Sequence, residues 1–136
     1  GIKVNILGKT SSFSQPLKKI LKDTIKKTMK NKKLIVNLAL NYGSKNEIKN
    51  AFIKLKKKRS KVTENEISKN LYTAKQPDPD ILIRTGGQKR LSNFMLWQLA
   101  YSELYFLNKL WPDFNPKDLK KVIKDYRSIK RNFGKV

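Results

Sequence analysis

The stretch ILIRTGGQKRLSNF, residues 81–94, places two arginines and two glycines directly after a run of large aliphatic side chains. The aliphatic run is typical of a buried strand, and Arg84 stands where that strand leaves the sheet. A guanidinium group is costly at such a position unless an anion meets it. Gly86 and Gly87 allow the backbone to turn sharply and to approach a ligand, and Arg90 follows after a short loop.

Strand-like and helix-like segments alternate on both sides of this stretch. Strands are predicted near 2–8, 34–40, 80–84 and 103–106, and helices near 14–30, 44–55, 64–71, 93–101 and 115–129. This order predicts the α/β class, with a parallel sheet of about four strands flanked by helices. We expect residues 1–136 to form a single domain, since the length suits one hydrophobic core.

Local signals refine these elements. Ser44 with Glu47, and Thr63 with Glu66, have the spacing of a capping box at a helix start. The nearly continuous apolar run at 34–40 predicts a strand that is covered on both faces. Ligands of parallel sheets collect beyond the carboxyl ends of the strands, so the loops after 40 and after 84 are expected at the same edge.

An anion site is predicted after the strand that ends at Arg84. Ser92 and Asn93 are natural N-caps of the predicted helix 93–101, whose free N–H groups favour an anion. Two arginines, a hydroxyl and a helix end together suit a diphosphate. The residues alone leave a second interpretation open, in which Arg84 pairs with Asp78 or Asp80 and Ser92 only caps the helix.

The composition bounds the class of protein. A net charge of +22 attracts nucleic acid, anionic lipid or phosphorylated metabolites. Because 27 of the 32 cationic residues are lysines, a solvated surface accounts for most of this charge, and the five arginines carry more information. The absence of cysteine excludes disulfides and thiolate metal sites, and the absence of histidine removes the usual general base. We expect a cytoplasmic protein, at most peripheral to the membrane.

Two longer segments carry a family resemblance. DILIRTGGQKRLSNFMLWQLAYSELYF at 80–106, the LWPDF at 110–114 and NLALNYGSKNEI at 37–48 closely resemble the C-terminal part of cis-prenyltransferases of the undecaprenyl diphosphate synthase type. The resemblance implies condensation of isopentenyl diphosphate with an allylic diphosphate, giving a long-chain polyprenyl diphosphate that serves as a lipid carrier in cell-wall synthesis. It also implies Mg²⁺ as cofactor, a homodimer, and peripheral membrane contact through the product.

The resemblance assigns roles to individual residues. Arg84, Arg90, the backbone of Leu91 and Ser92 are expected to bind the diphosphate of isopentenyl diphosphate. Glu103 is expected to help hold Mg²⁺, although the residue by itself is better explained as a surface carboxylate at the end of a helix.

The chain also departs from the family pattern. It lacks the N-terminal strand and the DGNGRWA phosphate-binding loop, which contains a metal-binding aspartate, so no catalytic residue is assigned and this chain is expected to be inactive alone. Gln88 stands where glutamate is common, Lys89 where histidine or glutamine is common, and Asn132 where the C-terminal motif has an arginine.

Two other functions are compatible with the sequence. A basic nucleic-acid-binding module would explain the net charge, but the chain has no RNP, KH or helix-turn-helix signature, so no specific nucleic-acid partner is expected. A non-catalytic partner subunit of an active cis-prenyltransferase would explain Gln88 and the missing aspartate. The large aromatic residues from Trp97 to Trp111 are expected in the core or at a dimer interface.

Overall fold

The structure, a computed structural model, describes residues 1–130, so Asn132 and its predicted effect lie outside the described residues. The described chain contains four strands, four α-helices and one 3₁₀-helix. They fall into two compact units, residues 1–75 and the residues from 76 onward. The prediction of a single domain stays a prediction.

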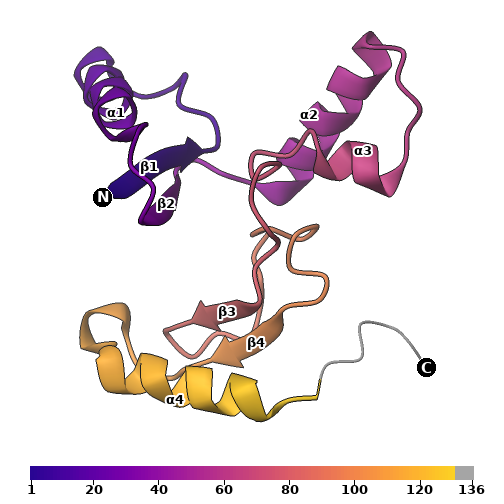
Figure 1. The fold of residues 1–136 in the computed structure, drawn as a ribbon. Coiled ribbons are helices and arrows are strands. Elements are labelled where there is room, and N and C mark those ends of the chain that lie inside the picture. Colours follow the sequence, from indigo (N-terminus) through magenta and orange to yellow (C-terminus); the bar gives the residue numbers. More distant parts are fainter. Residues whose placement is uncertain (131–136) are drawn as a thin grey trace. The chain divides into compact units, whose positions relative to one another are not determined.

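The first unit starts with a parallel strand pair (Figure 1). β1 (Ile2–Leu7) pairs with β2 (Leu34–Ala39) in a register that runs from Ile2 opposite Leu34 to Leu7 opposite Ala39. α1 (Gln15–Thr28) connects the strands and packs on β1. The Thr28 hydroxyl at its end accepts a hydrogen bond from the Val4 amide at 3.1 Å. The predicted parallel pairing is therefore confirmed here.

The predicted cover on both faces of β2 is not found in residues 1–130. Leu34 is 55% exposed and Leu38 is 43% exposed, although both lie within the strand. The apolar run predicted the strand correctly, but an apolar composition does not itself supply a covering layer.

A helix pair completes the first unit. α2 (Ser44–Lys57) contacts the short α3 (Glu64–Ser68). The expected cap of α3 is confirmed, since the Thr63 hydroxyl accepts a hydrogen bond from the Glu66 amide. The expected capping box at Ser44 is wrong: the N-cap of α2 is Gly43, and Ser44 is already helical and buried. Glu47 is drawn into the interior instead, where it is 2% exposed.

The second unit contains the other parallel pair. β3 (Ile81–Arg84) pairs with β4 (Glu103–Phe106), with Ile81 opposite Glu103 and Arg84 opposite Phe106. All four strands predicted from the sequence are therefore present, as two parallel two-stranded sheets.

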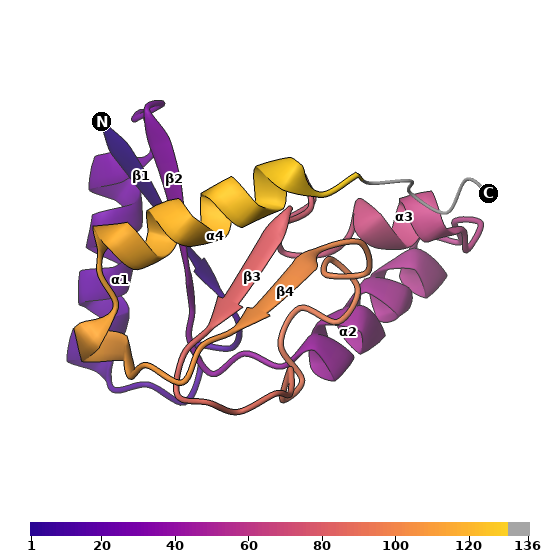
Figure 2. The ribbon, with the colours of Figure 1, turned by 90° about the horizontal axis from the view of Figure 1, so that it is seen from below.

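Helical segments follow β4. η1 (Trp111–Asp113) leads into α4 (Pro116–Ser128), which lies along one side of the β3–β4 pair (Figure 2). A capping box of Asn115 and Asp118 starts α4, and Pro116 occupies its first turn, as expected. Val122 is 3% exposed and anchors the helix to the unit.

The predicted helix at 93–101 is wrong, because this segment forms a series of turns. Ser92, Asn93 and Met95 have φ values of 48°, 63° and 45°, which an α-helix excludes. Gln98 and Leu99 are nevertheless only 2% and 6% exposed. Leu99 is thus buried through a chain of turns, whereas Leu96 and Tyr101 of the same segment are 37% and 64% exposed. The expected helix N-terminus, with its dipole and free N–H groups, is not formed.

Among residues 1–130, none of the helices combines the length and the apolar character that crossing a bilayer requires.

Candidate anion-binding site

The loop after β3 is held in place by backbone hydrogen bonds. The Leu107 amide donates to the Arg84 carbonyl at 2.8 Å, the Gly87 amide donates to the Leu107 carbonyl at 2.9 Å, and the Gly86 amide donates to the Lys109 carbonyl at 2.9 Å. Gly86 and Gly87 have φ values of 87° and 74°, a region that other residues rarely adopt. The glycine pair therefore turns the chain, and the loop after β4 fixes the turn.

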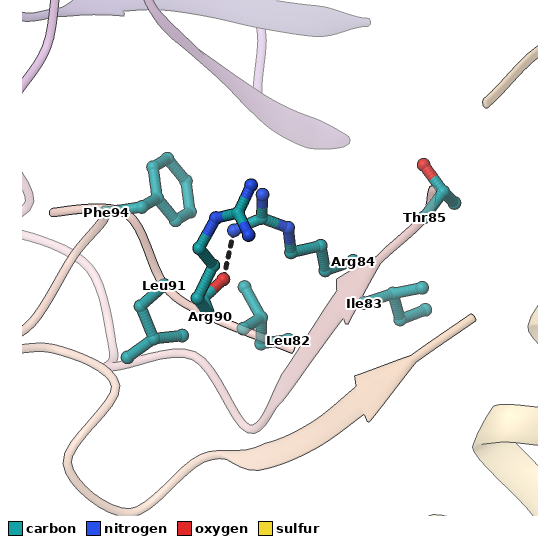
Figure 3. Close-up of a pocket in the computed structure, with 7 residues that line it drawn as sticks. All are labelled: Leu82, Ile83, Arg84, Thr85, Arg90, Leu91 and Phe94. Atoms are coloured by element: carbon teal, nitrogen blue, oxygen red, sulfur yellow. Dashed lines mark hydrogen bonds between the residues drawn. The ribbon is translucent and has the colours of Figure 1, made fainter. Parts of the chain in front are cut away.

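This fixed loop borders a cavity of about 290 Å³. The cavity opens beside the carboxyl end of β3 (Figure 3). Its lining consists of two cationic, one hydroxyl and four apolar side chains: Leu82, Ile83, Arg84, Thr85, Arg90, Leu91 and Phe94. A hollow of this size has room for a small ligand, and its position matches the expected location beyond the strand end.

The two arginines of the cavity lie together. Both side chains line the cavity, and Figure 3 draws them extending toward the same part of it. Nη1 of Arg84 donates a hydrogen bond to the carbonyl oxygen of Arg90, and it also lies 3.2 Å from the Ser92 hydroxyl oxygen. Nη1 of Arg90 donates to Oε1 of Gln88 at 2.5 Å. The sequence prediction that Arg84, Arg90 and Ser92 converge thus agrees with the geometry.

The acceptors around these arginines are neutral. Within residues 1–130, neither Arg84 nor Arg90 forms an ion pair with a carboxylate. The alternative pairing of Arg84 with Asp78 or Asp80 is therefore not formed, and Asp80 instead accepts a hydrogen bond from the Tyr126 hydroxyl at 3.0 Å. Two neighbouring cations that lack a counter-charge repel each other, and a bound anion would remove this repulsion.

Ser92 and Leu91 contribute differently from what the predicted helix suggested. The Ser92 hydroxyl accepts a hydrogen bond from Arg84 and does not cap a helix. Leu91 lines the cavity, and its carbonyl accepts a hydrogen bond from the Phe94 amide at 3.0 Å. The donors of the site are therefore the two guanidinium groups, which the Arg90 carbonyl and the side-chain oxygens of Ser92 and Gln88 hold in place.

Comparisons with known proteins show which family the chain belongs to. A family model described as "Putative undecaprenyl diphosphate synthase" matches residues 1–134. The chain belongs to the cis-prenyltransferase family. The isoprenyl transferase of Rickettsia typhi is 43% identical over 136 residues, which are 99% of this chain and 60% of that protein. The isoprenyl transferase of Aquifex pyrophilus is 42% identical over 137 residues, covering 59% of its length.

Solved structures of cis-prenyltransferases show the same fold. A probable undecaprenyl diphosphate synthase from Campylobacter jejuni has a TM-score of 0.92 and 34% identity, over 98% of this chain and 64% of that one. Lavandulyl diphosphate synthase from Lavandula x intermedia, solved in complex with dimethylallyl diphosphate, has a TM-score of 0.91 and 33% identity, over 98% and 61% of the two chains. The chain thus spans about 60% of the length of the relatives that it matches.

Glu103 lies apart from the arginine cavity. It opens β4 opposite Ile81, whereas Arg84 ends β3, and side chains alternate between the faces of a sheet. By this alternation Glu103 shares a face with Tyr105, and Arg84 occupies the other face. Burial raises the pKa of Tyr105, and the negative charges of Asp125 and Glu103 raise it further.

The described residues do not fit a complete Mg²⁺ site. Residues 1–130 contain no group of three carboxylate, histidine or cysteine side chains close enough to hold a metal ion. Mg²⁺ prefers six oxygen ligands, of which Glu103 would supply only one side chain.

The sequence did not predict several features of the site. The contact between Gln88 and Arg90 and the cavity wall formed by Leu82 and Phe94 were not expected. The separation of two positions between Gln88 and Arg90 was visible in the sequence, but the turn that brings their side chains together depends on how the loop folds.

Proposed function

We propose that this chain provides the isopentenyl diphosphate site of a cis-prenyltransferase that makes a long-chain polyprenyl diphosphate of the undecaprenyl type, a lipid carrier for cell-wall synthesis. The observation that supports it is the pair of arginines, Arg84 and Arg90, that line one cavity and form no ion pair with a carboxylate of residues 1–130. A diphosphate suits such a cavity, because its oxygens can accept charge-assisted hydrogen bonds from both guanidinium groups.

The proposed roles follow from the side chains. Arg84 and Arg90 bind the non-bridging oxygens of the diphosphate with charge-assisted hydrogen bonds. The Ser92 hydroxyl supports Arg84, and the backbone of Leu91 is a further proposed contact of the diphosphate. The apolar part of the cavity, formed by Leu82 and Phe94, accommodates the five-carbon group.

This binding orients the double bond of isopentenyl diphosphate toward the allylic substrate. In the condensation, the allylic carbon–oxygen bond breaks and its diphosphate leaves. The double bond of the isopentenyl group supplies the electron pair for the new carbon–carbon bond, and a proton is then lost to form the new cis double bond. This chain contributes the positioning of the isopentenyl group, and we assign it no catalytic residue.

Mg²⁺ belongs to the proposal as the cofactor of the complete enzyme, with Glu103 as one ligand. When bound, the ion would neutralise the charge of a leaving diphosphate. Exchanging Glu103→Gln should raise the Mg²⁺ concentration needed for half-maximal activity without changing the binding of inorganic pyrophosphate to this chain. An unchanged Mg²⁺ requirement would remove Glu103 from the proposed metal site.

We also propose that the protein is a homodimer in the cytoplasm. Its contact with the membrane is peripheral and occurs through the product. Trp111 is 74% exposed and Tyr101 is 64% exposed, and large aromatic side chains on a surface are common at protein interfaces. Trp111 stacks on Phe114 with ring centroids 5.9 Å apart, so its orientation is already restrained before any partner binds.

Titration calorimetry with inorganic pyrophosphate tests the diphosphate site directly. The unsubstituted chain should bind pyrophosphate, and the double variant R84A/R90A should not bind it at the same ligand concentrations. Binding that is absent from the unsubstituted chain, or unchanged in the double variant, would overturn the proposal.

A complementation assay tests whether this chain supports catalysis. The chain is mixed with a separately produced N-terminal fragment of a related isoprenyl transferase, and incorporation of labelled isopentenyl diphosphate into polyprenyl product is measured. Product formation supports the synthase. If pyrophosphate binds normally but no product forms in a mixture whose components associate, the chain is a non-catalytic partner subunit.

A further inference from the structure

Gln88 makes a specific contact with one of the two arginines of the cavity. Its Oε1 accepts a hydrogen bond from Nη1 of Arg90 at 2.5 Å. Both side chains belong to the exposed loop that follows Gly87, so general packing does not restrain the Arg90 side chain. The carbonyl of Arg90 is already bound to Arg84, which fixes the backbone but not the guanidinium group of Arg90.

A free Arg90 side chain would not remain over the cavity. Arginine has many accessible rotamers, and ordering it costs conformational entropy. The neighbouring Arg84 guanidinium adds electrostatic repulsion, since no carboxylate within residues 1–130 pairs with either group. An additional contact is therefore needed to hold Arg90 beside Arg84 before the ligand arrives.

The chemistry of an amide suits this role. The Gln88 carbonyl oxygen accepts the hydrogen bond and restrains the guanidinium, yet it carries no net charge that would neutralise Arg90. The remaining N–H donors of Arg90 stay available to an anion.

We infer that Gln88 is a positioning residue for Arg90, which it holds ready to bind the diphosphate. This inference rests on the proposed function. Gln88 acts through Arg90 and is not assigned a contact with the ligand.

A double-mutant cycle tests this inference. Pyrophosphate affinity is measured by calorimetry for the unsubstituted chain, Q88A, R90A and Q88A/R90A. Q88A should weaken binding about 10-fold, because the conformational entropy lost when Arg90 becomes ordered is then subtracted from the binding free energy. In the R90A background, Q88A should have no further effect, since the residue through which Gln88 acts is gone.

Two more variants complete the design. Q15A makes the same chemical change at an exposed position at the start of α1, and it should leave affinity unchanged. Q88E keeps a hydrogen-bond acceptor, so at high salt it should bind pyrophosphate more tightly than Q88A, while the charge that it places against Arg90 keeps its affinity below that of the unsubstituted chain. Circular dichroism and the urea midpoint confirm that each variant folds.

The outcomes separate the inference from the proposed function. If the unsubstituted chain binds pyrophosphate but Q88A binds equally well, the inference fails and the diphosphate site stands. If Q88A weakens binding equally with and without Arg90, or if Q88E is no better than Q88A at high salt, Gln88 does not act through Arg90. If the unsubstituted chain does not bind pyrophosphate, the proposed function itself fails.

Discussion

The ends of β2 and β3 place charged residues in comparable positions but use them in opposite ways. After β2, the Glu47 carboxylate of α2 is buried, and it accepts hydrogen bonds from the Tyr42 hydroxyl and from the Tyr72 amide at 2.6 Å. After β3, Arg84 and Arg90 lie in the wall of a cavity, and no carboxylate in residues 1–130 pairs with them.

The difference teaches how a structural charge is distinguished from a ligand-binding one. A charge whose partners all come from its own chain stabilises the fold, because breaking those contacts leaves buried polar groups unsatisfied. A charge that the fold restrains without neutralising is instead available to a ligand. The position of a charged residue at a strand end does not decide between the two roles.

The largest expected effect concerns ligand binding at the end of β3. Replacing Arg84→Ala should weaken pyrophosphate binding about 100-fold, because it removes charge-assisted hydrogen bonds to the anion. Urea unfolding should show no loss of stability, since the substitution also removes repulsion from Arg90. A loss of stability with normal pyrophosphate affinity would make Arg84 a structural residue and break the comparison.

The second effect concerns stability at the end of β2. Replacing Glu47→Ala should lower the free energy of unfolding by about 2 kcal/mol, because the Tyr42 hydroxyl and the Tyr72 amide lose an acceptor inside the protein. Glu47→Gln keeps a hydrogen-bond acceptor, so it should lower the free energy of unfolding by less than Glu47→Ala. Pyrophosphate affinity should be unchanged in both, and a weakened affinity would show that Glu47 is not purely structural.

A smaller effect on pyrophosphate binding is expected when the Ser92 hydroxyl, which supports Arg84, is removed. Replacing Ser92→Ala removes the hydroxyl that lies 3.2 Å from Nη1 of Arg84, while the Arg90 carbonyl continues to hold the side chain. Pyrophosphate binding should weaken about threefold, as for one neutral hydrogen bond. Calorimetry on S92A is the measurement, and S102A, the same chemical change at another serine, is its control. A loss as large as that of R84A would instead indicate direct contact of Ser92 with the ligand.

The smallest effect is a pH dependence of the loop that supports the site. Both carboxylate oxygens of Asp118 lie 2.8 Å from the side-chain ammonium of Lys109. The backbone carbonyl of the same Lys109 accepts a hydrogen bond from the Gly86 amide. The hydrogen bond from Lys109, followed by that from the Asn115 amide, lowers the pKa of Asp118 below its ordinary value of 3.8.

A carboxylate whose pKa is lower in the folded than in the unfolded protein stabilises the fold at any pH above its unfolded pKa. This stabilisation is lost as the pH falls through the folded pKa. The urea midpoint of Asp118→Asn should therefore lie below that of the unsubstituted chain at about pH 7, and the difference should shrink toward about pH 3. A difference that is independent of pH would mean that the carboxylate charge contributes nothing.

Periodicity and capping signals predicted most of the elements. The apolar runs predicted all four strands, and α1 and α4 begin within a residue or two of the positions that Pro16 and Asn115 indicated. These signals act over a few residues, and hydrophobic spacing and proline geometry hold in any context.

The prediction failed where the backbone adopts conformations that composition does not specify. Residues 93–101 have an apolar content that suits a helix, yet Ser92, Asn93 and Met95 have positive φ values. Asparagine and serine tolerate this region through local hydrogen bonds, so tertiary packing decided the outcome. At Ser44 the capping-box spacing was present, but burial of Glu47 excluded that arrangement.

The sequence by itself determined the α/β order, the parallel strands and the family, because alternating apolar runs and the 80–114 segment depend only on residue order. Only the tertiary structure decided that Arg84 pairs with no carboxylate of the described residues while Glu47 is enclosed, and that the side chains of Gln88 and Arg90 are in contact. Whether a charge is neutralised depends on contacts made in three dimensions, which no local pattern of residues specifies.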